Sequence, residues 1–463
     1  MLLNLAAGII LTCVAGAATP PPGADDEGQA SRSAAESVTK TRTAIFDEVW
    51  SELSKHDAFF NPKSAENRAL RKEFRARIAA TDDPVERRRL LVRALSRIKD
   101  GHLALTTRWF LPDKPPPPLP LAGDAPMYEP RLELAGFHRD YYGQIEFPDE
   151  KGADGKARAE LCPLVSIDDA PLDSGGNAWS LLNGPQDTDV ALVFERADGR
   201  RVTRSLRRTE AVQPQMHYAP TTQRAVPNPE GGAPKKEEVE VVIDSQRLEG
   251  NLGYIRIQHL VTMQVVDDFN LALDGLMETD GLILDLRNTG GGYPWVMVPI
   301  IGRFFDKPQK VCSFDGRSPA IGTLVRSVGK IGIAPAGKTY DKPLVVLIND
   351  HTASMSEGLS FCLGDTGRGL LMGRPTMGLN AAIRNTTLSD GTVLWHSWIR
   401  VNRLTGEHYQ NVGVQPQERV EASDDDMRRL GIRQAQWLEY DLQFETAVKR
   451  LREKVAGSGK DKG

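Results

Sequence analysis

The spacing of apolar residues changes along the chain, and each spacing predicts a different kind of element. Over residues 39–98, apolar residues recur three or four positions apart among charged ones, which predicts amphipathic helices. Over residues 121–210, short β-type runs are separated by turn residues such as Asp198 and Gly199, which predicts a β-rich module. From residue 248 onward, apolar runs alternate with helical patterns, which predicts an α/β domain.

The N-terminus has a different composition from the rest of the chain. Residues 1–18 are apolar and end in small residues, which is typical of a signal peptide, and residues 19–38 have the composition of a disordered tether. We therefore expect an exported protein, periplasmic or extracellular, and an uncleaved N-terminus would hold it near a membrane. Three cysteines follow this leader, an odd number, so no disulfide framework is expected to hold the fold.

Composition excludes several classes of function. The 463 residues are 40% hydrophobic and 26% charged, with a net charge of −4 and no long basic run, so nucleic acid is not an expected partner. Neither a phosphate-binding glycine loop with lysine nor a dinucleotide fingerprint occurs in the sequence. Histidines and cysteines show no metal-ligand spacing, and we expect neither a metal nor a cofactor.

One junction in the C-terminal half suggests a nucleophile. The apolar run 344–348 ends in a polar turn, and small hydroxyl residues then lead into a helical pattern. Ser354 lies at this strand-to-helix junction, where a helix N-terminus favours negative charge and amides can hold an oxyanion. The alternative is a structural helix cap made by Ser356 or Thr352.

A second apolar run, residues 281–286, ends close to three consecutive glycines at positions 290–292. Glycine takes a positive φ at no steric cost, so such a loop can present amides beside a developing oxyanion. A tight turn that only leaves a strand would explain the glycines equally well.

Five segments in order along the chain resemble motifs of the tail-specific (C-terminal processing) and tricorn-core serine protease superfamily. They are Gly253-Tyr254-Ile255-Arg256-Ile257, Asp285-Leu286-Arg287 with the three glycines, Thr352-Ala353-Ser354-Met355-Ser356-Glu357, Gly373-Arg374-Pro375-Thr376-Met377-Gly378 and Asn411-Val412-Gly413-Val414-Gln415-Pro416. The resemblance implies Ser354 as nucleophile, with the amides of Met355 and of Gly291 or Gly292 as the oxyanion hole. It also implies an α/β fold with a crotonase/ClpP-like spiral catalytic domain, and no cofactor.

Residues 164–172 and 189–196 resemble the C-terminal half of a PDZ domain, a module that can capture peptides along a sheet edge. A strand-rich module that only gates the catalytic cleft is the alternative. The complete division is a signal peptide (1–18), a disordered tether (19–38), an N-terminal helical domain (39–110), a PDZ-like domain (121–210), a polar, irregular linker (211–246), a catalytic α/β domain (247–425), and a C-terminal helix with a disordered tail (426–463).

The sequence departs from the tail-specific branch at the general base. That branch has a lysine directly after the Gly-x-x-Thr-x-Gly element, where this chain has Leu379, and leucine cannot accept a proton. The tricorn-like branch uses a histidine from the N-terminal helical region, at a place that resembles Asp100-Gly101-His102. We therefore expect His102 to be the base, with a structural histidine as the other interpretation and His351 as a lesser candidate base.

A second departure concerns the group that orients the base. Tricorn-like relatives have a glutamate where this chain has Gln410, whose carbonyl can hold a tautomer but cannot stabilise imidazolium as a carboxylate does. Glu407 is a nearby substitute. We expect Asp365 and Glu357 to be structural, the latter for example as a partner of Arg287.

Two functions follow from these residues. The first is an exported serine endopeptidase that hydrolyses unstructured or C-terminal polypeptide segments, in which Ser354 attacks the scissile carbonyl and His102 moves the proton. The second is a catalytically inactive protein that binds peptides or small ligands on the same scaffold, which the departures at Leu379 and Gln410 favour. The sequence indicates neither the cleavage preference nor the oligomeric state.

Overall fold

The computed structural model describes residues 32–106, 127–130, 142–151, 155, 157–172, 181–182, 184–185, 188–196, 198–211, 221–226, 235–317, 324–430 and 432–458. The chain divides into two compact units, residues 1–42 and 43–463. Of the first unit only residues 32–42 are described, and they form the start of a helix. The predicted signal peptide lies outside the described residues. The predicted tether differs from expectation in its last part, because residues 32–38 include the helix formers alanine and glutamate and are helical.

Three helices make up the N-terminal helical region: α2 (Arg32–His56), α3 (Ala65–Ala80) and α4 (Pro84–Ser96). The side chain of Ser64 caps α3 and that of Asp83 caps α4. Apolar residues at helical spacing bury one shared core, which includes Phe46, Trp50, Leu53, Leu70, Phe74, Ile78, Leu91 and Leu95. No helix in the described part of the chain is both long enough and apolar enough to cross a membrane.

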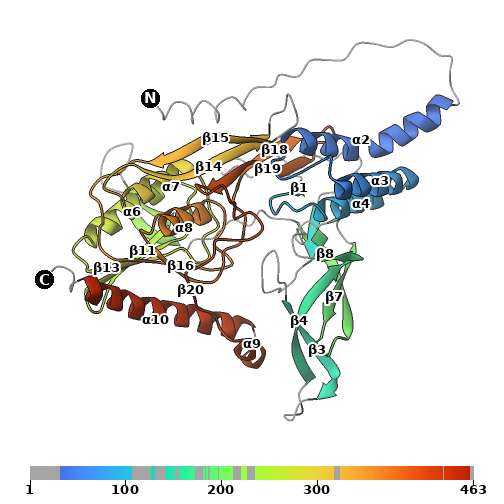
Figure 1. Ribbon diagram of the computed structural model, residues 1–463. Coiled ribbons are helices and arrows are strands. Elements are labelled where there is room, and N and C mark those ends of the chain that lie inside the picture. Colours follow the sequence, from blue (N-terminus) through green and yellow to red (C-terminus); the bar gives the residue numbers. More distant parts are fainter. Residues whose placement is uncertain are drawn as a thin grey trace. The chain divides into compact units, whose positions relative to one another are not determined.

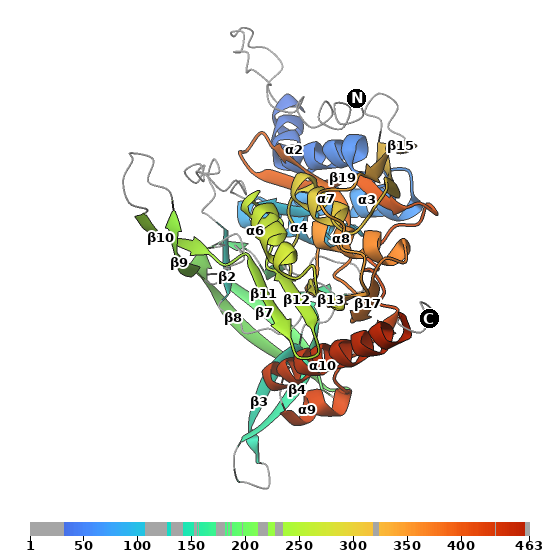
Figure 2. The same cartoon turned by 90° about the vertical axis from the view of Figure 1, so that its left-hand side faces the viewer.

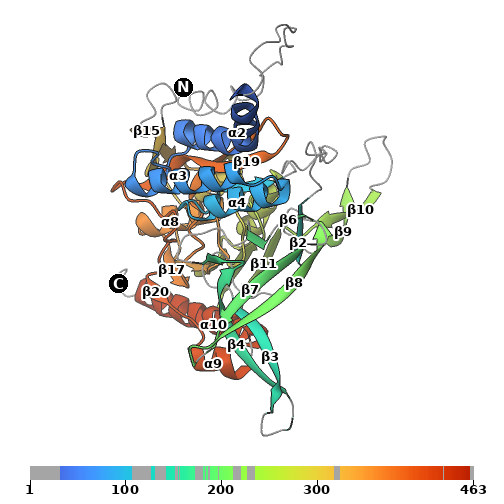
Figure 3. The ribbon, with the colours of Figure 1, turned by 90° about the vertical axis from the view of Figure 1, so that its right-hand side faces the viewer.

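The β-rich module forms a seven-stranded sheet. Its strands are β2 (Met127–Pro130), β3 (Tyr142–Lys151), β4 (Ala157–Ile167), β5 (Ala170–Pro171), β6 (Gly184–Pro185), β7 (Asp189–Glu195) and β8 (Arg201–Ala211). Their order is β3-β4-β7-β8-β2-β6, with β5 paired to β4, and Figure 3 shows the long strands side by side. The predicted turn at Asp198-Gly199 joins β7 to β8, with Gly199 at φ 81°.

The segment expected to be an irregular linker, residues 211–246, contains paired strands instead. β9 (Thr221–Val226) and β10 (Lys235–Glu240) form an antiparallel ribbon, which Figure 2 shows beside β11 (Ile243–Leu248). The polar composition of β9 and β10 gave no alternation of apolar positions, and that alternation is the signal from which a strand is normally predicted.

The α/β domain is built on a six-stranded sheet of order β11-β12-β13-β16-β17-β20. After β11 its strands are β12 (Leu252–Ile257), β13 (Gly281–Asp285), β16 (Leu344–Ile348), β17 (Leu370–Gly373) and β20 (Glu418–Arg419), each parallel to its neighbour in this series. Because both faces of β13 and β16 are covered, every residue in these two strands is buried.

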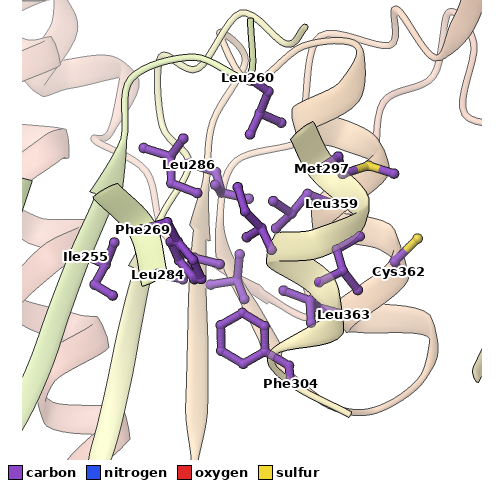
Figure 4. Packing of buried hydrophobic residues seen from close by; sticks show 14 of the residues in the cluster. Ile255, Leu260, Phe269, Leu284, Leu286, Met297, Phe304, Leu359, Cys362 and Leu363 are labelled. Atoms are coloured by element: carbon purple, nitrogen blue, oxygen red, sulfur yellow. The ribbon is translucent and has the colours of Figure 1, made fainter. Parts of the chain in front are cut away.

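Helices cover the two faces of this sheet (Figure 1). On one face lie α6 (Gln264–Gly275), α7 (Pro294–Gly302) and α8 (Met355–Asp365), and Figure 4 shows Phe269, Leu284 and Leu359 in the core between them and the strands. The other face is covered by α10 (Ile432–Ser458), which follows the short α9 (Asp424–Leu430). Phe444 and Val448 of this helix pack there.

A second sheet joins the helical region to the α/β domain. Its order is β1-β19-β14-β15, with β18 also paired to β19, and its strands are β1 (Ala104–Thr106), β14 (Gln309–Arg317), β15 (Leu324–Ile333), β18 (Ala381–Thr387) and β19 (Val393–Arg403). Strand β1 begins two residues after His102 and pairs antiparallel with β19. This pairing fixes the place of His102 against the second sheet.

Candidate active site

Ser354 occupies the position directly before α8, in a backbone conformation that non-glycine residues rarely adopt. Its φ is 54° and its ψ is −120°. The surrounding backbone is fixed on both sides, since the amide of Ala353 donates to the carbonyl of Thr289 at 3.0 Å and the amide of Met377 donates to that of Thr352 at 3.0 Å. Backbone strain of this kind persists only where the surroundings impose it, and it concentrates at functional sites.

Glu357 holds the nucleophile segment to the following loop. One oxygen accepts from Thr376 Oγ1 at 2.5 Å and from the amide of Gly378 at 2.8 Å. The other accepts from the amides of Ser354 at 2.9 Å and Leu379 at 2.8 Å. Burial raises the pKa of Glu357 to about 7, against the opposing effect of these hydrogen bonds. The carboxyl group therefore joins the serine motif to the Gly-x-x-Thr-x-Gly motif.

The expected pairing of Glu357 with Arg287 is wrong. Arg287 instead forms a buried ion pair with Asp285, with Nη2 2.5 Å from Oδ2, and its guanidinium stacks on the ring of Tyr440. The Ser-x-x-Glu spacing of a capping box was a sequence signal for the local role of Glu357. As expected, Asp365 is structural, because its carboxylate accepts from Arg403 at 2.7 and 2.9 Å.

The glycine loop lies directly against Ser354. A methyl group added at Gly291 would be 2.7 Å from Ser354 Cβ and 3.0 Å from the amide nitrogen of Met355, and φ at Gly291 is 99°. The carbonyl of Gly291 accepts from the amide of Leu260 at 2.8 Å, and a methyl at Gly292 would overlap the Leu260 carbonyl. Within the described ranges the amides of Met355, Gly291 and Gly292 donate no hydrogen bond.

His102 lies in a tight turn between α4 and β1. Its amide donates to Asp100 Oδ1 at 3.0 Å, and its Nδ1 lies 3.2 Å from Ser397 Oγ in β19. Its Nε2 is enclosed and, among the described residues, has no hydrogen-bond partner. Burial lowers the pKa of His102, and the charge of Asp100 opposes this effect. The imidazole is therefore neutral at neutral pH, as a general base must be.

Gln410 lies beside His102 but presents a different atom from the one expected. Its Nε2 donates to Asp100 Oδ1 at 3.0 Å and lies 3.5 Å from His102 Nδ1, whereas its carbonyl oxygen has no partner among the described residues. This orientation follows from charge, since a carbonyl facing the Asp100 carboxylate would be repelled. Glu407, the other candidate for orienting the base, instead accepts a hydrogen bond from Arg403 at 3.1 Å.

Leu379 connects the two halves of the site. A methyl added at Gly101 would be 2.5 Å from Leu379 Cδ2, so the leucine side chain lies against the turn that carries His102. The Leu379 amide shares Glu357 Oε2 with the amide of Ser354. Across the described part of the chain, no hydrogen bond joins Ser354 to His102 directly.

Among the described residues, no group of three or more histidine, cysteine, aspartate or glutamate side chains is placed to hold a metal ion.

Residues 251–420 match the sequence pattern of Peptidase family S41. This part of the chain is therefore similar to that family. The chain is 28% identical over 245 residues to the chloroplastic C-terminal processing peptidase of Tetradesmus obliquus, covering 51% of this chain and 47% of the relative. It is 30% identical over 190 residues to the carboxyl-terminal-processing protease of Synechocystis sp., covering 40% and 41%.

The match to S41 confirms the resemblance on which the site was predicted. The chain spans about half the length of the curated relatives it matches. A crystal structure of mature CPAF superposes with a TM-score of 0.54 at 15% identity, covering 90% of this chain and 96% of that one, which shows a shared fold.

Proposed function

We propose that this protein is an exported serine endopeptidase that hydrolyses unstructured or C-terminal polypeptide segments. The observation that carries the proposal is the strained Ser354 beside unused amides of Met355 and Gly291. An acyl-transfer site requires a presented nucleophile with backbone amides close to it, and the strained Ser354 next to these amides fits that requirement. Relatives named as C-terminal processing peptidases support the substrate class.

In this mechanism Ser354 Oγ attacks the scissile carbonyl carbon while its proton passes to His102 Nε2. The carbonyl oxygen becomes an oxyanion held by the amides of Met355 and of Gly291 or Gly292, each donor contributing about 100- to 1000-fold in rate. His102 then returns the proton to the leaving amine, the C–N bond breaks, and an acyl-enzyme remains. Water, deprotonated by His102, hydrolyses the ester and restores Ser354.

The missing Ser354–His102 hydrogen bond implies a closing step. Catalytic hydrogen bonds are often long or absent without substrate and tighten in the complex. We propose that a bound peptide brings the His102 turn toward Ser354, with Leu379 as the apolar contact that moves. The β-rich module, which we propose to be PDZ-like, would admit the unstructured chain to this site.

A binding protein on the same scaffold is the second candidate, since Leu379 replaces the lysine and the serine and histidine are not bonded. The test is labelling of purified protein with a fluorophosphonate probe, with and without added unfolded polypeptide. For a peptidase we expect labelling of the wild type, none in Ser354→Ala and strongly reduced labelling in His102→Ala. Absence of labelling and of hydrolysis in both conditions would favour the binding protein. Labelling that survives in His102→Ala would identify a different base, with His351 examined next.

A further inference from the structure

We propose that Ser397 and Asp100 form a relay that orients the imidazole of His102. In this relay the Nδ1–H of His102 donates to Ser397 Oγ, and the Ser397 hydroxyl donates to Asp100 Oδ1. The inference rests on the proposed function, because it names the residues that position the proposed base. Neither residue touches the reacting atoms, so both are positioning residues.

Counting the hydroxyl proton of Ser397 fixes the direction of the relay. Ser397 Oγ lies 2.7 Å from Asp100 Oδ1 and 3.2 Å from His102 Nδ1. A hydroxyl has one proton, and the shorter, charge-assisted bond to the carboxylate takes it. Only a lone pair of Ser397 remains for His102. The side-chain amide of Gln410 lies farther from Nδ1, at 3.5 Å, and donates to Asp100 Oδ1 at 3.0 Å, so we assign the hydrogen of the shorter Ser397 contact to Nδ1. The Nε2 atom then holds the lone pair that accepts the serine proton.

Asp100 is built to serve as the fixed negative end of this relay. It is buried, and four donors surround it: the amide of His102 at 3.0 Å, the Ser397 hydroxyl at 2.7 Å, the Ser397 amide at 2.9 Å and Gln410 Nε2 at 3.0 Å. A second buried acid, Asp57, interacts with it: burial and the charge of Asp100 raise the pKa of Asp57 to about 7.

Ser397 is aimed by an irregularity in its strand. The pairing of β18 with β19 shifts register between Ala382 and Ile383, opposite Ile399 and Ser397. A bulge of this kind bends a strand and redirects side chains, and bulges recur beside active sites. The Ser397 carbonyl is also fixed, because it accepts from the amide of Ala58 at 2.8 Å. The backbone that carries both hydrogen bonds from Ser397 to Asp100 is therefore fixed in place.

The relay accounts for the departure at Gln410. A glutamine cannot supply the negative charge that stabilises an imidazolium, and here its amide supports Asp100 instead. When His102 accepts a proton, the cation lies one hydroxyl away from the Asp100 carboxylate. The carboxylate, Asp100, thus lies in the same turn as His102, and the Ser397 hydroxyl links its negative charge to Nδ1 of His102.

The decisive experiment measures the tautomer of His102 by ¹⁵N NMR of histidine-labelled protein, which needs no peptidase activity. The His102 resonances are assigned by their loss in His102→Gln. Free imidazole side chains favour the Nε2–H tautomer, so we expect the wild type to show the opposite one, with hydrogen on Nδ1 and a bare Nε2. A wild-type His102 with hydrogen on Nε2 would overturn the relay, whatever the protein does to peptides.

Variants then test Ser397 itself. In Ser397→Ala we expect loss of the single Nδ1–H tautomer and a fall in kcat of about 10- to 100-fold with KM kept, below the loss of a whole acid–base group. In Ser397→Thr, which keeps the hydroxyl, we expect the Nδ1–H tautomer and kcat to return to the wild-type state. Ser313→Ala, which removes a buried hydroxyl from neighbouring β14, should change neither.

An unchanged tautomer in Ser397→Ala would contradict the relay. If the peptidase proposal alone fails, hydrolysis and labelling are absent while the tautomer still depends on Ser397. The two failures are therefore distinguishable.

Discussion

The two halves of the site are held in different ways. The nucleophile half is internally complete, because Glu357 binds the backbone of Ser354 and Leu379 and Gly291 packs on the serine. The base half is held by a separate network of Asp100, Ser397 and Gln410. Among the described residues, Nε2 of His102 has no hydrogen-bond partner. Where the halves meet, Leu379 packs on the turn that carries His102, and Asn411 donates to the carbonyls of Lys99 and Gly378. Each half is thus held by its own hydrogen bonds, and few contacts connect the two halves.

The largest expected effect comes from breaking the nucleophile half. Gly291→Ala places a methyl 2.7 Å from Ser354 Cβ at a φ of 99°, so the loop must move and an oxyanion donor is lost. We expect kcat for peptide hydrolysis to fall about 100- to 1000-fold. The matched control is Gly406→Ala, at φ 93° with open space around it, which carries the same backbone strain and should retain activity.

A buried histidine next to Ser397, His396, is expected to make the unfolding free energy of the protein depend on pH. His396, next to Ser397, lies 3.6 Å from both Glu52 and Asp57, and these carboxylates outweigh burial and raise its pKa to about 9 from 6.5. Between these pH values the folded state binds more protons than the unfolded state, so stability falls as pH rises. We expect a loss of up to about 3 kcal/mol in urea unfolding. In His396→Gln this slope should disappear, and a slope that persists would assign it to other groups.

Glu357→Gln tests whether the nucleophile half depends on one carboxyl group. A glutamine can accept on only one side, so either the Ser354 and Leu379 amides or the Thr376 and Gly378 donors lose their partner. We expect a loss of about 2 kcal/mol in unfolding free energy and slower probe labelling of Ser354. Glu445→Gln on the exposed side of α10 is the control, and equal losses in both variants would refute the specific role.

The smallest effect concerns the pH profile of the base half. Because burial lowers the pKa of His102, its neutral form persists to lower pH than that of an ordinary histidine. We expect kcat/KM to rise with pH through an apparent pKa below 6.5, and this acidic limb to vanish in His102→Ala. A limb at or above 6.5 would mean that substrate binding or another group sets the titration.

How far the sequence could predict the site depended on whether partners lie close together in the chain. Ser354 and Met355 are adjacent, and their strand-to-helix junction is a local pattern, so both were placed correctly at the start of α8. Ser397 lies 295 residues from His102 and carried no signal of its own within a strand pattern. Asp100 was in the quoted motif, but its role depends on donors from β19 and from Gln410. Such long-range contacts arise only from tertiary pairing.

The same reason explains the difference between confirmed and missed parts of the fold. The apolar runs of β13 and β16 predicted a covered sheet, because burial on both faces requires continuous apolar residues. The polar strands β9 and β10 carried no such requirement and were expected to be a linker.

The pairing of the three-residue strand β1 with β19 has a consequence for biosynthesis. The two strands are separated by nearly three hundred positions in the chain, and closing so large a loop has an entropic cost that later contacts must offset. On a ribosome, Ser354 is made before Ser397, and the proposed base cannot be oriented until β19 has emerged and folded. A half-made chain would carry the proposed nucleophile without an oriented base, so the proposed peptidase would stay latent until its synthesis is complete.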